Sequence, residues 1–429
     1  MPEKINSIKN KIRFFYTSDF LSTGSSKFFI LLVSLISSIF LTRFMGPQIK
    51  GEYAYLINVV SLATVILNFG IYQSYPTLKN QGIKNLQDKY ISLFIFQFII
   101  LISVFISILL LFNISQVYSW GLILIPIMLL TNQMSFLFIV DDIKRRNIAI
   151  VLGSFSYLLA TIILYYFFQS SLYPVILILI FKELITLLIL LINYKIKINI
   201  HSLNKKLIKK IFSFGLFAAA SQLLLVLNYK IDIFILKPFV PLTELGYYSL
   251  GAGMAALAWI IPDIFKETLL SRISKKNYIA ETTISLRLSL TISYIILLVI
   301  LFFGKDLIVL LYGDSFTPAY KVTVYLFVGI IGMIFYKIIG NVFLVRGDKK
   351  MVLYTLLVGS VMNILLNYIL IPRFGIIGAA VASLISYSTC GFYLLFSYCK
   401  LFTVKLQDVL LVNFNDVNLV KKEIRKTRQ

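Results

Sequence analysis

Apolar residues fall in blocks of about 20 along this chain, the length at which a helix spans a bilayer. No other feature constrains the fold more strongly, because a protein in water does not expose so much continuous apolar surface. Of the 429 residues, 59% are hydrophobic and 14% are charged, whereas soluble domains average about 45–50% and about 25%. We therefore expect an all-α polytopic membrane protein.

The blocks predict twelve transmembrane helices, arranged as two sets of six. The first set is placed at 20–43, 53–73, 90–112, 118–139, 148–168 and 173–193, and the second at 211–236, 246–270, 284–303, 322–345, 352–371 and 376–399. A long basic loop separates the two sets. The expected domains are an N-terminal six-helix lobe over 1–194, a cytoplasmic linker loop over 195–210, a C-terminal six-helix lobe over 211–400 and a basic cytoplasmic tail over 401–429.

The basic residues indicate how the chain is oriented. Lys and Arg number 41 against 18 Asp and Glu, which gives a net charge of +23. With the N-terminus in the cytoplasm, and with Arg43 and Arg287 near span ends counted with the adjoining loops, 30 of these 41 residues lie in inner segments, six in outer loops and five within spans. Inner loops of membrane proteins carry such an excess, so we expect both termini to be cytoplasmic. The same distribution explains the charge without nucleic acid as a partner.

The two halves of the chain resemble each other. Phe44 and Gly51 after the first span match Phe239 and Gly246 in the second half. Because each set has an even number of spans, both halves enter the membrane from the same side, which gives two bundles related by a pseudo-twofold axis along the membrane normal. A cleft between two such lobes is where an alternating-access carrier would hold its substrate.

Motifs for phosphate-dependent or nucleophilic catalysis are missing from the sequence. Gly304-Lys305 lacks the spacing and the hydroxyl residue of a phosphate-binding loop, and the only histidine, His201, lies in a lysine-rich loop. The pair Asp141-Asp142 precedes three basic residues in a short inner loop, and we interpret it as solvated. We therefore expect a transporter rather than an enzyme, with no metal site and no cofactor besides a coupling H⁺ or Na⁺.

Ionisable residues inside the spans are the candidate site residues, because a charge at this depth is costly and faces a cavity or a partner. The cations are Lys27, Lys182, Lys230 and Lys337, and the anions are Glu183 and Asp232. Residues one or two positions apart point to different faces of a helix. We therefore expect Lys182 and Glu183, like Lys230 and Asp232, to find partners on other helices or in water.

Four lysines lining one cleft would form a net-positive, watery chamber. Such a chamber suits an anionic head group, above all pyrophosphate, whose oxygens accept charge-assisted hydrogen bonds. Lys230 is the first candidate for this contact, and Glu183 or Asp232 is expected to balance the lysines or to couple to a proton. Lys266 lies near a span end, where lysines reach the interface, and Asp263 is placed to bond it.

Three segments carry a family resemblance. They are Thr42-Arg43-Phe44-Met45-Gly46-Pro47 with Gly51-Glu52-Tyr53, then Tyr229-Lys230-Ile231-Asp232, and finally Asn363-x3-Asn367 through Ile371-Pro372-Arg373-Phe374-Gly375 to Gly378-Ala379-Ala380. These segments resemble the polysaccharide flippases of the multidrug/oligosaccharidyl-lipid/polysaccharide exporter superfamily, the O-antigen (Wzx-type) flippases in particular. The likeness spans the chain from about 20 to 400.

The resemblance implies both a function and partners. It implies two six-helix bundles with a central cationic cavity, and flipping of an undecaprenyl-pyrophosphate-linked oligosaccharide to the outer leaflet of a bacterial inner membrane. This oligosaccharide would be an O-antigen or another surface polysaccharide repeat unit. The implied partners are the lipid-linked glycan, the bilayer and a polysaccharide polymerase and chain-length complex. The family often uses arginine in its cavity, whereas lysines occupy the span interiors here.

Three other functions stay open at this point. A drug/cation antiporter of the same superfamily needs an acidic site in the first lobe, whereas the first span has no acid beyond Asp19 and the second to fifth have none at their centres. A lipid II flippase typically has two further C-terminal helices. A membrane-embedded surface-glycan polymerase would need a large outer loop, and the longest one here, about 304–321, is short and nearly neutral.

Overall fold

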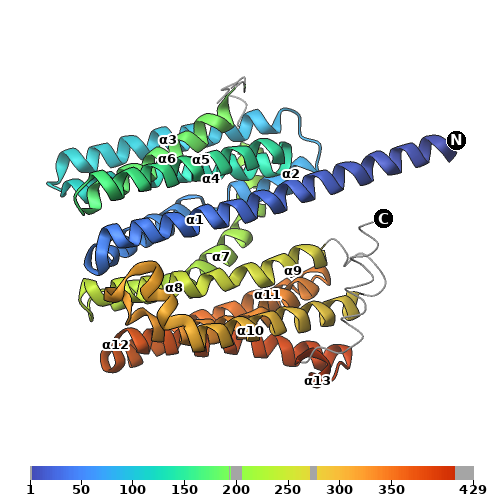
Figure 1. Ribbon diagram of the computed structural model, residues 1–429. Helices are drawn as coiled ribbons and strands as arrows, with labels where there is room; N and C mark the ends of the chain where they lie inside the picture. The colour runs from blue at the N-terminus through green and yellow to red at the C-terminus, as the bar shows by residue number, and fades with distance from the viewer. Residues whose placement is uncertain (1, 193, 195–204, 271–277, 411–429) are drawn as a thin grey trace. The chain divides into compact units, whose positions relative to one another are not determined.

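The structure is a computed structural model that describes residues 2–192, 194, 205–270 and 278–410. Within these ranges the chain is helical and contains no strand (Figure 1), which confirms the prediction of an all-α protein. Side chains are not described before residue 26, at Lys27 or over 266–278. Residues 195–204 of the predicted linker and 411–429 of the predicted tail lie outside the described residues.

Ten of the described helices are long and apolar enough to cross a membrane. The chain divides into two compact units, Met1–Leu223 and Leu224–Gln429, and the boundary falls within α7 (Lys205–Leu236). The first unit contains α1 (Pro2–Leu67), η1 (Tyr72–Ser74), α2 (Tyr75–Lys79), α3 (Leu86–Leu111), α4 (Gln116–Asp141), α5 (Ile143–Phe167) and α6 (Leu172–Leu191). The second contains α8 (Leu242–Ala256), η3 (Leu257–Trp259), α9 (Ile260–Leu270), α10 (Tyr278–Tyr312), η4 (Asp314–Phe316), α11 (Ala319–Val345), α12 (Lys349–Phe402) and α13 (Leu406–Leu410).

Two of the ten helices are interrupted by a glycine. In α1, Gly46 has a φ of 63° and a ψ of 177° and precedes Pro47. In α12, Gly375 has a φ of 53° and a ψ of −134°, a conformation that favours glycine because a side chain would clash there. The chain turns back on itself in α12, because Asn363 Nδ2 lies 3.2 Å from Ser383 Oγ, whereas 20 residues of straight helix would separate them by about 30 Å.

One predicted span, 246–270, is not a continuous helix. α8 ends at Ala256, the 3₁₀ turn η3 follows, and α9 begins at Ile260. Pro262 in the first turn of α9 has no N–H to donate to the turn before it, and short 3₁₀ segments within helices often mark hinges. Fewer backbone hydrogen bonds therefore hold α8 and α9 in line than would hold a regular helix of the same length.

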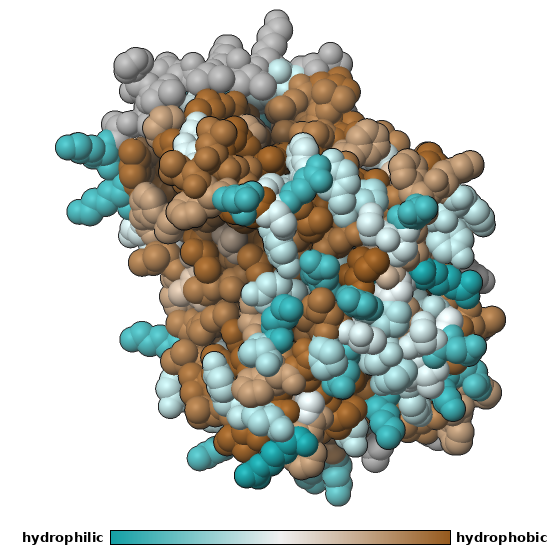
Figure 2. Space-filling model, turned by 90° about the vertical axis from the view of Figure 1, so that its left-hand side faces the viewer, coloured by the Kyte–Doolittle hydropathy of each residue, from teal (hydrophilic) through white to brown (hydrophobic). Residues whose placement is uncertain are grey.

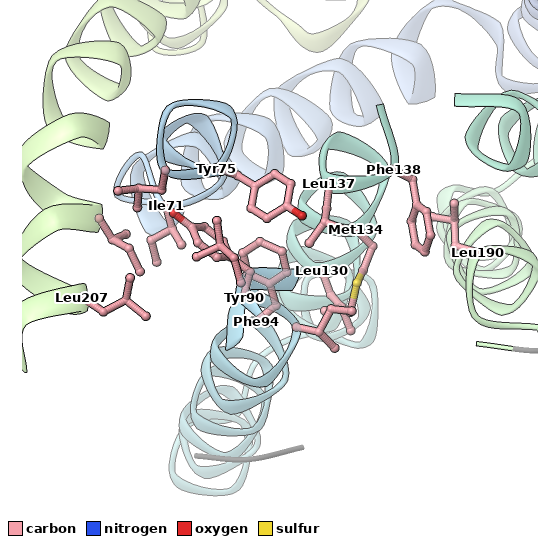
Figure 3. Close-up of a cluster of buried hydrophobic side chains, with 14 of the residues drawn as sticks. Ile71, Tyr75, Tyr90, Phe94, Leu130, Met134, Leu137, Phe138, Leu190 and Leu207 are labelled. Atoms are coloured by element: carbon pink, nitrogen blue, oxygen red, sulfur yellow. The ribbon is translucent and has the colours of Figure 1, made fainter. Parts of the chain in front are cut away.

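The core of the first unit gathers side chains from helices that are far apart in the sequence. Figure 3 shows Tyr75, Tyr90 and Phe94 grouped with Met134 of α4, and Leu207 of α7 lies at the edge of the same cluster. The rings of Tyr75 and Tyr90 lie edge to face with their centroids 4.9 Å apart, which is a favoured geometry for buried aromatic pairs. The first turns of α7 thus pack as part of the first unit.

Close packing in the second unit rests on small residues. α11 is the most deeply buried of the candidate spans. A Cβ atom added at Gly391 of α12 would overlap the carbonyl oxygen of Gly332 of α11, and one added at Gly329 would approach the Cα atom of Leu384 to 2.8 Å. Small residues let helices approach closely where lipid removes the hydrophobic gain from association. The two helices are therefore packed backbone to backbone.

Apolar side chains cover much of the outer surface of the protein. Figure 2 shows broad hydrophobic areas on the face in view. Large apolar side chains such as Leu110, Phe167 and Phe302 are mostly exposed. Soluble proteins rarely expose patches of this extent, whereas lipid-facing helices require them. The surface is that of a multi-pass membrane protein.

Candidate functional site

A carboxylate, Asp232 of α7, lies in the interior of the second unit with only 2% of the residue exposed. Tyr248 of α8 donates a hydrogen bond to its Oδ2 over 2.5 Å. Ser383 donates to the same oxygen over 2.6 Å, and Asn367 donates to Oδ1 over 2.7 Å, both from α12. Among the described residues no basic side chain forms an ion pair with it. The partners of Asp232 on other helices are therefore neutral donors.

Amides and hydroxyls extend the network around Asp232. Asn363 Nδ2 lies 3.2 Å from Ser383 Oγ and 3.3 Å from Ser386 Oγ. Ser386 in turn donates to Asn228 Oδ1 over 3.1 Å, and all of these side chains are buried. Asn367 Oδ1 is also buried, and it receives no hydrogen bond from the described residues. This acceptor is a place where a donor or a cation would be stabilised.

The atoms of this network decide what it could hold. A buried carboxylate without a basic partner is costly, and either a proton or a bound cation would lower that cost. Asp232, Asn367 and Ser383 offer carboxylate, amide and hydroxyl oxygens, the ligands that hard cations prefer, whereas softer metals prefer nitrogen and sulfur. The residues therefore fit a proton or a hard monovalent cation such as Na⁺.

Lys337 of α11 is held by two residues of the interrupted span. Its Nζ lies 2.8 Å from Asp263 Oδ1 and 4.3 Å from the centroid of the Trp259 ring. A cation in the membrane interior needs a partner, and the face of an indole adds cation–π attraction. The sequence analysis assigned Asp263 to Lys266, whose side chain lies outside the described residues. In the structure Asp263 pairs with Lys337.

Aromatic residues surround this ion pair. The ring of Tyr229 lies 5.0 Å from that of Trp259, and the ring of Tyr387 lies 5.6 Å and 6.0 Å from these two. The hydroxyl oxygen of Tyr229 is buried and has no hydrogen-bond partner among the described residues. A buried phenol of this kind can donate to an anionic oxygen. The cluster thus combines one cation, one carboxylate and one available donor.

Lys230 follows Tyr229 on α7 and is partly buried. Asp232, two positions further along, receives its hydrogen bonds from Tyr248, Ser383 and Asn367. No ion pair between Lys230 and Asp232 is present among the described residues, as expected for positions that point to different helix faces. The role of Lys230 itself stays a prediction.

The prediction that Lys182 and Glu183 are poorly placed to pair is wrong. Lys182 Nζ lies 3.0 Å from Glu183 Oε1. The long, flexible stem of lysine bridges the angle between two adjacent helix positions. The side chain of Glu183 is 10% exposed and that of Lys182 is 33% exposed, so the lysine neutralises a buried acid while part of its own side chain stays accessible.

Two charged positions named in the sequence analysis have side chains outside the described residues. Lys27 lies in α1 and Lys266 lies in α9. The role of Lys27 as a cavity cation therefore stays a prediction.

Sequence reasoning missed a buried amide network in the first unit. Asn68 Nδ2 donates to Gln73 Oε1 over 2.7 Å. Gln133 Nε2 lies 2.8 Å from Gln97 Oε1 and 3.3 Å from Asn68 Oδ1. Gln97 Nε2 donates to the carbonyl oxygen of Leu67, the last residue of α1, over 2.5 Å. These amides satisfy polar groups where α1 ends, as an apolar environment requires.

The interpretation of Asp141 as a solvated residue is also wrong. Asp141 accepts a hydrogen bond from Tyr75 over 2.7 Å and pairs with Lys79. Burial raises the pKa of the Tyr75 phenol, so the phenol stays a donor at physiological pH. Asp142 caps α5 by accepting a hydrogen bond from the backbone N–H of Arg145 over 3.1 Å. Both aspartates are therefore structural.

A pattern in the sequence does mark the network of the second unit. Three apolar helical segments each carry a pair of polar residues three or four positions apart: Asn228 and Asp232, Asn363 and Asn367, and Ser383 and Ser386. Residues at these spacings share one helix face. A polar pair on one face of a membrane helix indicates a partner on another helix, and here the three pairs meet.

Comparison with known families gives two matches. A family model described as "Polysaccharide biosynthesis protein" matches residues 17–262, which is more than half of the chain, and one described as "MatE" matches residues 274–369. These matches confirm the family resemblance that the sequence segments indicate. No curated protein matches the chain.

Solved structures with the same fold are transporters and flippases. An inward-facing multidrug resistance MATE family transporter of the MOP superfamily aligns with a TM-score of 0.67 at 14% identity, covering 88% of this chain and 96% of its own. The lipid II flippase MurJ in an inward closed conformation aligns with a TM-score of 0.67 at 18% identity, covering 91% and 89%. A MOP superfamily transporter from Pyrococcus furiosus aligns with a TM-score of 0.61 at 13% identity, covering 90% and 95%. At these identities the likeness shows the fold alone.

Proposed function

This chain belongs to the family of polysaccharide biosynthesis proteins, and from that membership we propose that it is a flippase for lipid-linked glycans. Its substrate is an undecaprenyl-pyrophosphate-linked oligosaccharide, which it moves from the cytoplasmic to the outer leaflet of a bacterial inner membrane by alternating access. The observation that carries the proposal is the family match over residues 17–262, on a chain that shares its fold with the flippase MurJ.

The proposed topology has twelve crossings with both termini in the cytoplasm. The glycine interruptions in α1 and α12 support this count. Phe28–Leu67 is 40 residues long and Lys349–Phe402 is 54 residues long, and one crossing needs only about 20 residues. The excess of basic residues in the inner segments supports the orientation. The lobes in this proposal are the predicted 1–194 and 211–400, with 195–210 and 401–429 on the cytoplasmic side.

The cations of the proposed substrate cavity are Lys230, Lys337, Lys182 and Lys27. The first three of these side chains are described, and each is only partly exposed, which suits a side chain that meets a ligand inside the protein. An anionic head group leaves water at a high cost unless charged donors replace the lost hydration. Lys230 is the first candidate among these cations, because it lies in the family-like segment Tyr229-Lys230-Ile231-Asp232 and is partly buried.

Asp232 is the proposed site for a coupling ion. The carboxylate of Asp232, the hydroxyls of Tyr248 and Ser383 that donate to it, and Asn367 Oδ1, which receives no hydrogen bond from the described residues, place several oxygens where a proton or Na⁺ could bind. Glu183 is the weaker candidate, because Lys182 already neutralises it. Binding of one cation at Asp232 would change the charge of the second unit by one and so bias one conformation over the other.

A drug/cation antiporter is the second candidate function. The MatE match over residues 274–369 and the MATE structure favour it. An antiporter of this superfamily needs an acidic site in its first lobe, and the buried Glu183 carries Lys182 beside it. A membrane-embedded polymerase fits less well, because α10 reaches Tyr312 and α11 begins at Ala319, which leaves only a short outer segment between them.

The proposal is tested in cells that lack this protein. We expect them to lose the surface polysaccharide and to accumulate the lipid-linked repeat unit in the cytoplasmic leaflet, and expression of the protein to reverse both changes. Unchanged surface polysaccharide together with increased sensitivity to cationic drugs would instead support the antiporter.

A further inference from the structure

The pair formed by Lys337 and Asp263 is unequal in burial. The side chain of Lys337 is 14% exposed, whereas that of Asp263 is 48% exposed. A buried cation needs an anion beside it at all times, because leaving it unpaired is strongly unfavourable. A half-exposed carboxylate, in contrast, is enclosed by fewer protein atoms, so its ion pair holds it less tightly. Asp263 can therefore be exchanged for another anion, whereas Lys337 cannot be left without one.

The two helical segments before and after η3 are fastened to α11 in different ways. A Cβ atom added at Gly251 of α8 would come within 2.8 Å of the Val322 side chain on α11, so α8 lies directly against that helix. The first turn of α9 is joined to α11 by the Asp263–Lys337 ion pair. Because η3 and Pro262 weaken the backbone between these segments, the ion pair is one of the contacts that hold the start of α9 against α11, beside the packing of these helices.

Beside the pair lies a donor without an acceptor. The Tyr229 hydroxyl is buried, and no described residue accepts its hydrogen. The Tyr229 ring contacts the ring of Trp259, over whose face Lys337 Nζ lies. An anion with several oxygens could accept from both the ammonium and the phenol, whereas Asp263 uses only the first of these donors.

We propose that Lys337 and Tyr229 form a binding site for a phosphate or pyrophosphate group, and that Asp263 is the anion which this group displaces. Displacement removes the ion pair between the first turn of α9 and α11, so arrival of the head group is transmitted to the interrupted span. The inference rests on the proposed flippase function and adds to it the residues that report an occupied site. Asp263 therefore competes with the substrate for Lys337 and does not bind the substrate itself.

Trp259 provides a direct readout, because the chain has only two tryptophans and Trp120→Phe leaves Trp259 as the sole emitter. The purified variant is titrated in detergent with undecaprenyl pyrophosphate, with uncharged undecaprenol and with inorganic pyrophosphate. We expect the pyrophosphate lipid to change the fluorescence of Trp259 and undecaprenol to leave it unchanged. A response to inorganic pyrophosphate alone identifies the anion itself as the ligand, and a response to the lipid alone shows that the chain adds to recognition.

The decisive variant is Asp263→Asn in the same background. Removal of the competitor should tighten binding of undecaprenyl pyrophosphate by roughly fivefold or more, the range of ordinary coupling between two ligands. Lys337→Gln should abolish the fluorescence response, Lys337→Arg should retain it, and Tyr229→Phe should weaken binding several-fold. Asp348→Asn, which removes the exposed partner of Arg346, is the matched control and should bind as the parent does.

Unchanged or weaker binding by a normally folded Asp263→Asn variant would overturn the inference, since an ion pair that only supports the fold has no competitor to remove. If Lys337→Gln fails to fold, the Asp263→Asn and Lys337→Arg titrations still decide the question. The proposed function fails separately, when the unaltered chain neither binds undecaprenyl pyrophosphate nor flips the glycan-linked form.

Discussion

Asp232 and Asn367 lie 135 positions apart in the chain and are joined by a hydrogen bond of 2.7 Å from the amide nitrogen to Oδ1. The amide nitrogen also donates to the carbonyl oxygen of Asn363 over 2.9 Å. The amide oxygen of Asn367 is buried and receives no hydrogen bond from the described residues. This bond ties α7 to α12 at a point where neither helix offers a basic residue to the carboxylate. The hydrogen bond between Asp232 and Asn367 therefore makes the contact between α7 and α12 depend on the charge of Asp232.

Replacing Asp232 by Asn should remove ion dependence from transport while largely keeping the fold. The asparagine side chain keeps one accepting oxygen and carries no charge. Its NH₂ group replaces the other oxygen and would face the donors that now bond Asp232, which should cost about 1–3 kcal/mol of stability. Flipping measured at several pH values and Na⁺ concentrations checks this expectation. Unaltered ion dependence in Asp232→Asn would show that coupling resides elsewhere.

Replacing Gly391 by Ala should destabilise the second unit. The added methyl group would overlap the carbonyl oxygen of Gly332, and overpacking of this kind costs about 1–3 kcal/mol. The melting temperature of the purified protein in detergent reports the loss. Gly253→Ala is the matched control, because a Cβ atom there meets nothing within 4 Å, and it should melt at or above the temperature of the parent. Equal melting of both variants would contradict the close approach of α11 and α12.

The pair formed by Lys182 and Glu183 should respond unequally to the loss of each partner. Lys182→Met leaves the more buried carboxylate without a cation, whereas Glu183→Gln leaves a lysine that is partly exposed. Breaking a buried pair is costly mainly through the charge that remains, so Lys182→Met should lower the melting temperature more than Glu183→Gln. The double variant should recover part of the loss. A larger effect of Glu183→Gln would show that Lys182 has a second role.

The sequence was sufficient for the class of fold, because spans of about 20 apolar residues and the bias of basic residues toward one side follow directly from the bilayer. It did not show that the span 246–270 is interrupted at Trp259, since the apolar composition continues across the 3₁₀ turn. The interruptions at Gly46 and Gly375 could be predicted in part from the sequence, because each glycine has a proline close by and proline is unfavourable inside a helix.

For the site, the sequence named the charged residues but not their partners. Asp232 and Lys337 are conspicuous as charges in apolar spans, whereas Tyr248, Ser383 and Trp259 are ordinary residues of membrane helices. Only the packing of helices brings these partners to the charged residues. A charge buried in the membrane interior requires such partners. The error at Lys182 and Glu183 has a different cause, because helix geometry fixes the Cβ atoms but not the end of a long side chain.

Removal of the charge at Lys230 should abolish glycan export, while keeping a cation should preserve much of it. Lys230→Gln offers no charge to a pyrophosphate, whereas Lys230→Arg donates to phosphate at least as well as lysine, subject to the space its larger fork needs. Surface glycan measured in cells, with the amount of protein in the membrane as the control, separates the two variants. Normal export by a well-expressed Lys230→Gln would remove this lysine from the site.

The most direct measurement of the central claim uses the purified chain in proteoliposomes that contain a fluorescent undecaprenyl-pyrophosphate-linked oligosaccharide. A membrane-impermeant quencher reports how much of the lipid has reached the opposite leaflet. We predict rapid transfer of the pyrophosphate-linked glycan, much slower transfer with Lys230→Gln, and no uptake of a cationic dye by the same vesicles. Dye uptake driven by an ion gradient, with the lipid-linked glycan confined to its original leaflet, would contradict the account.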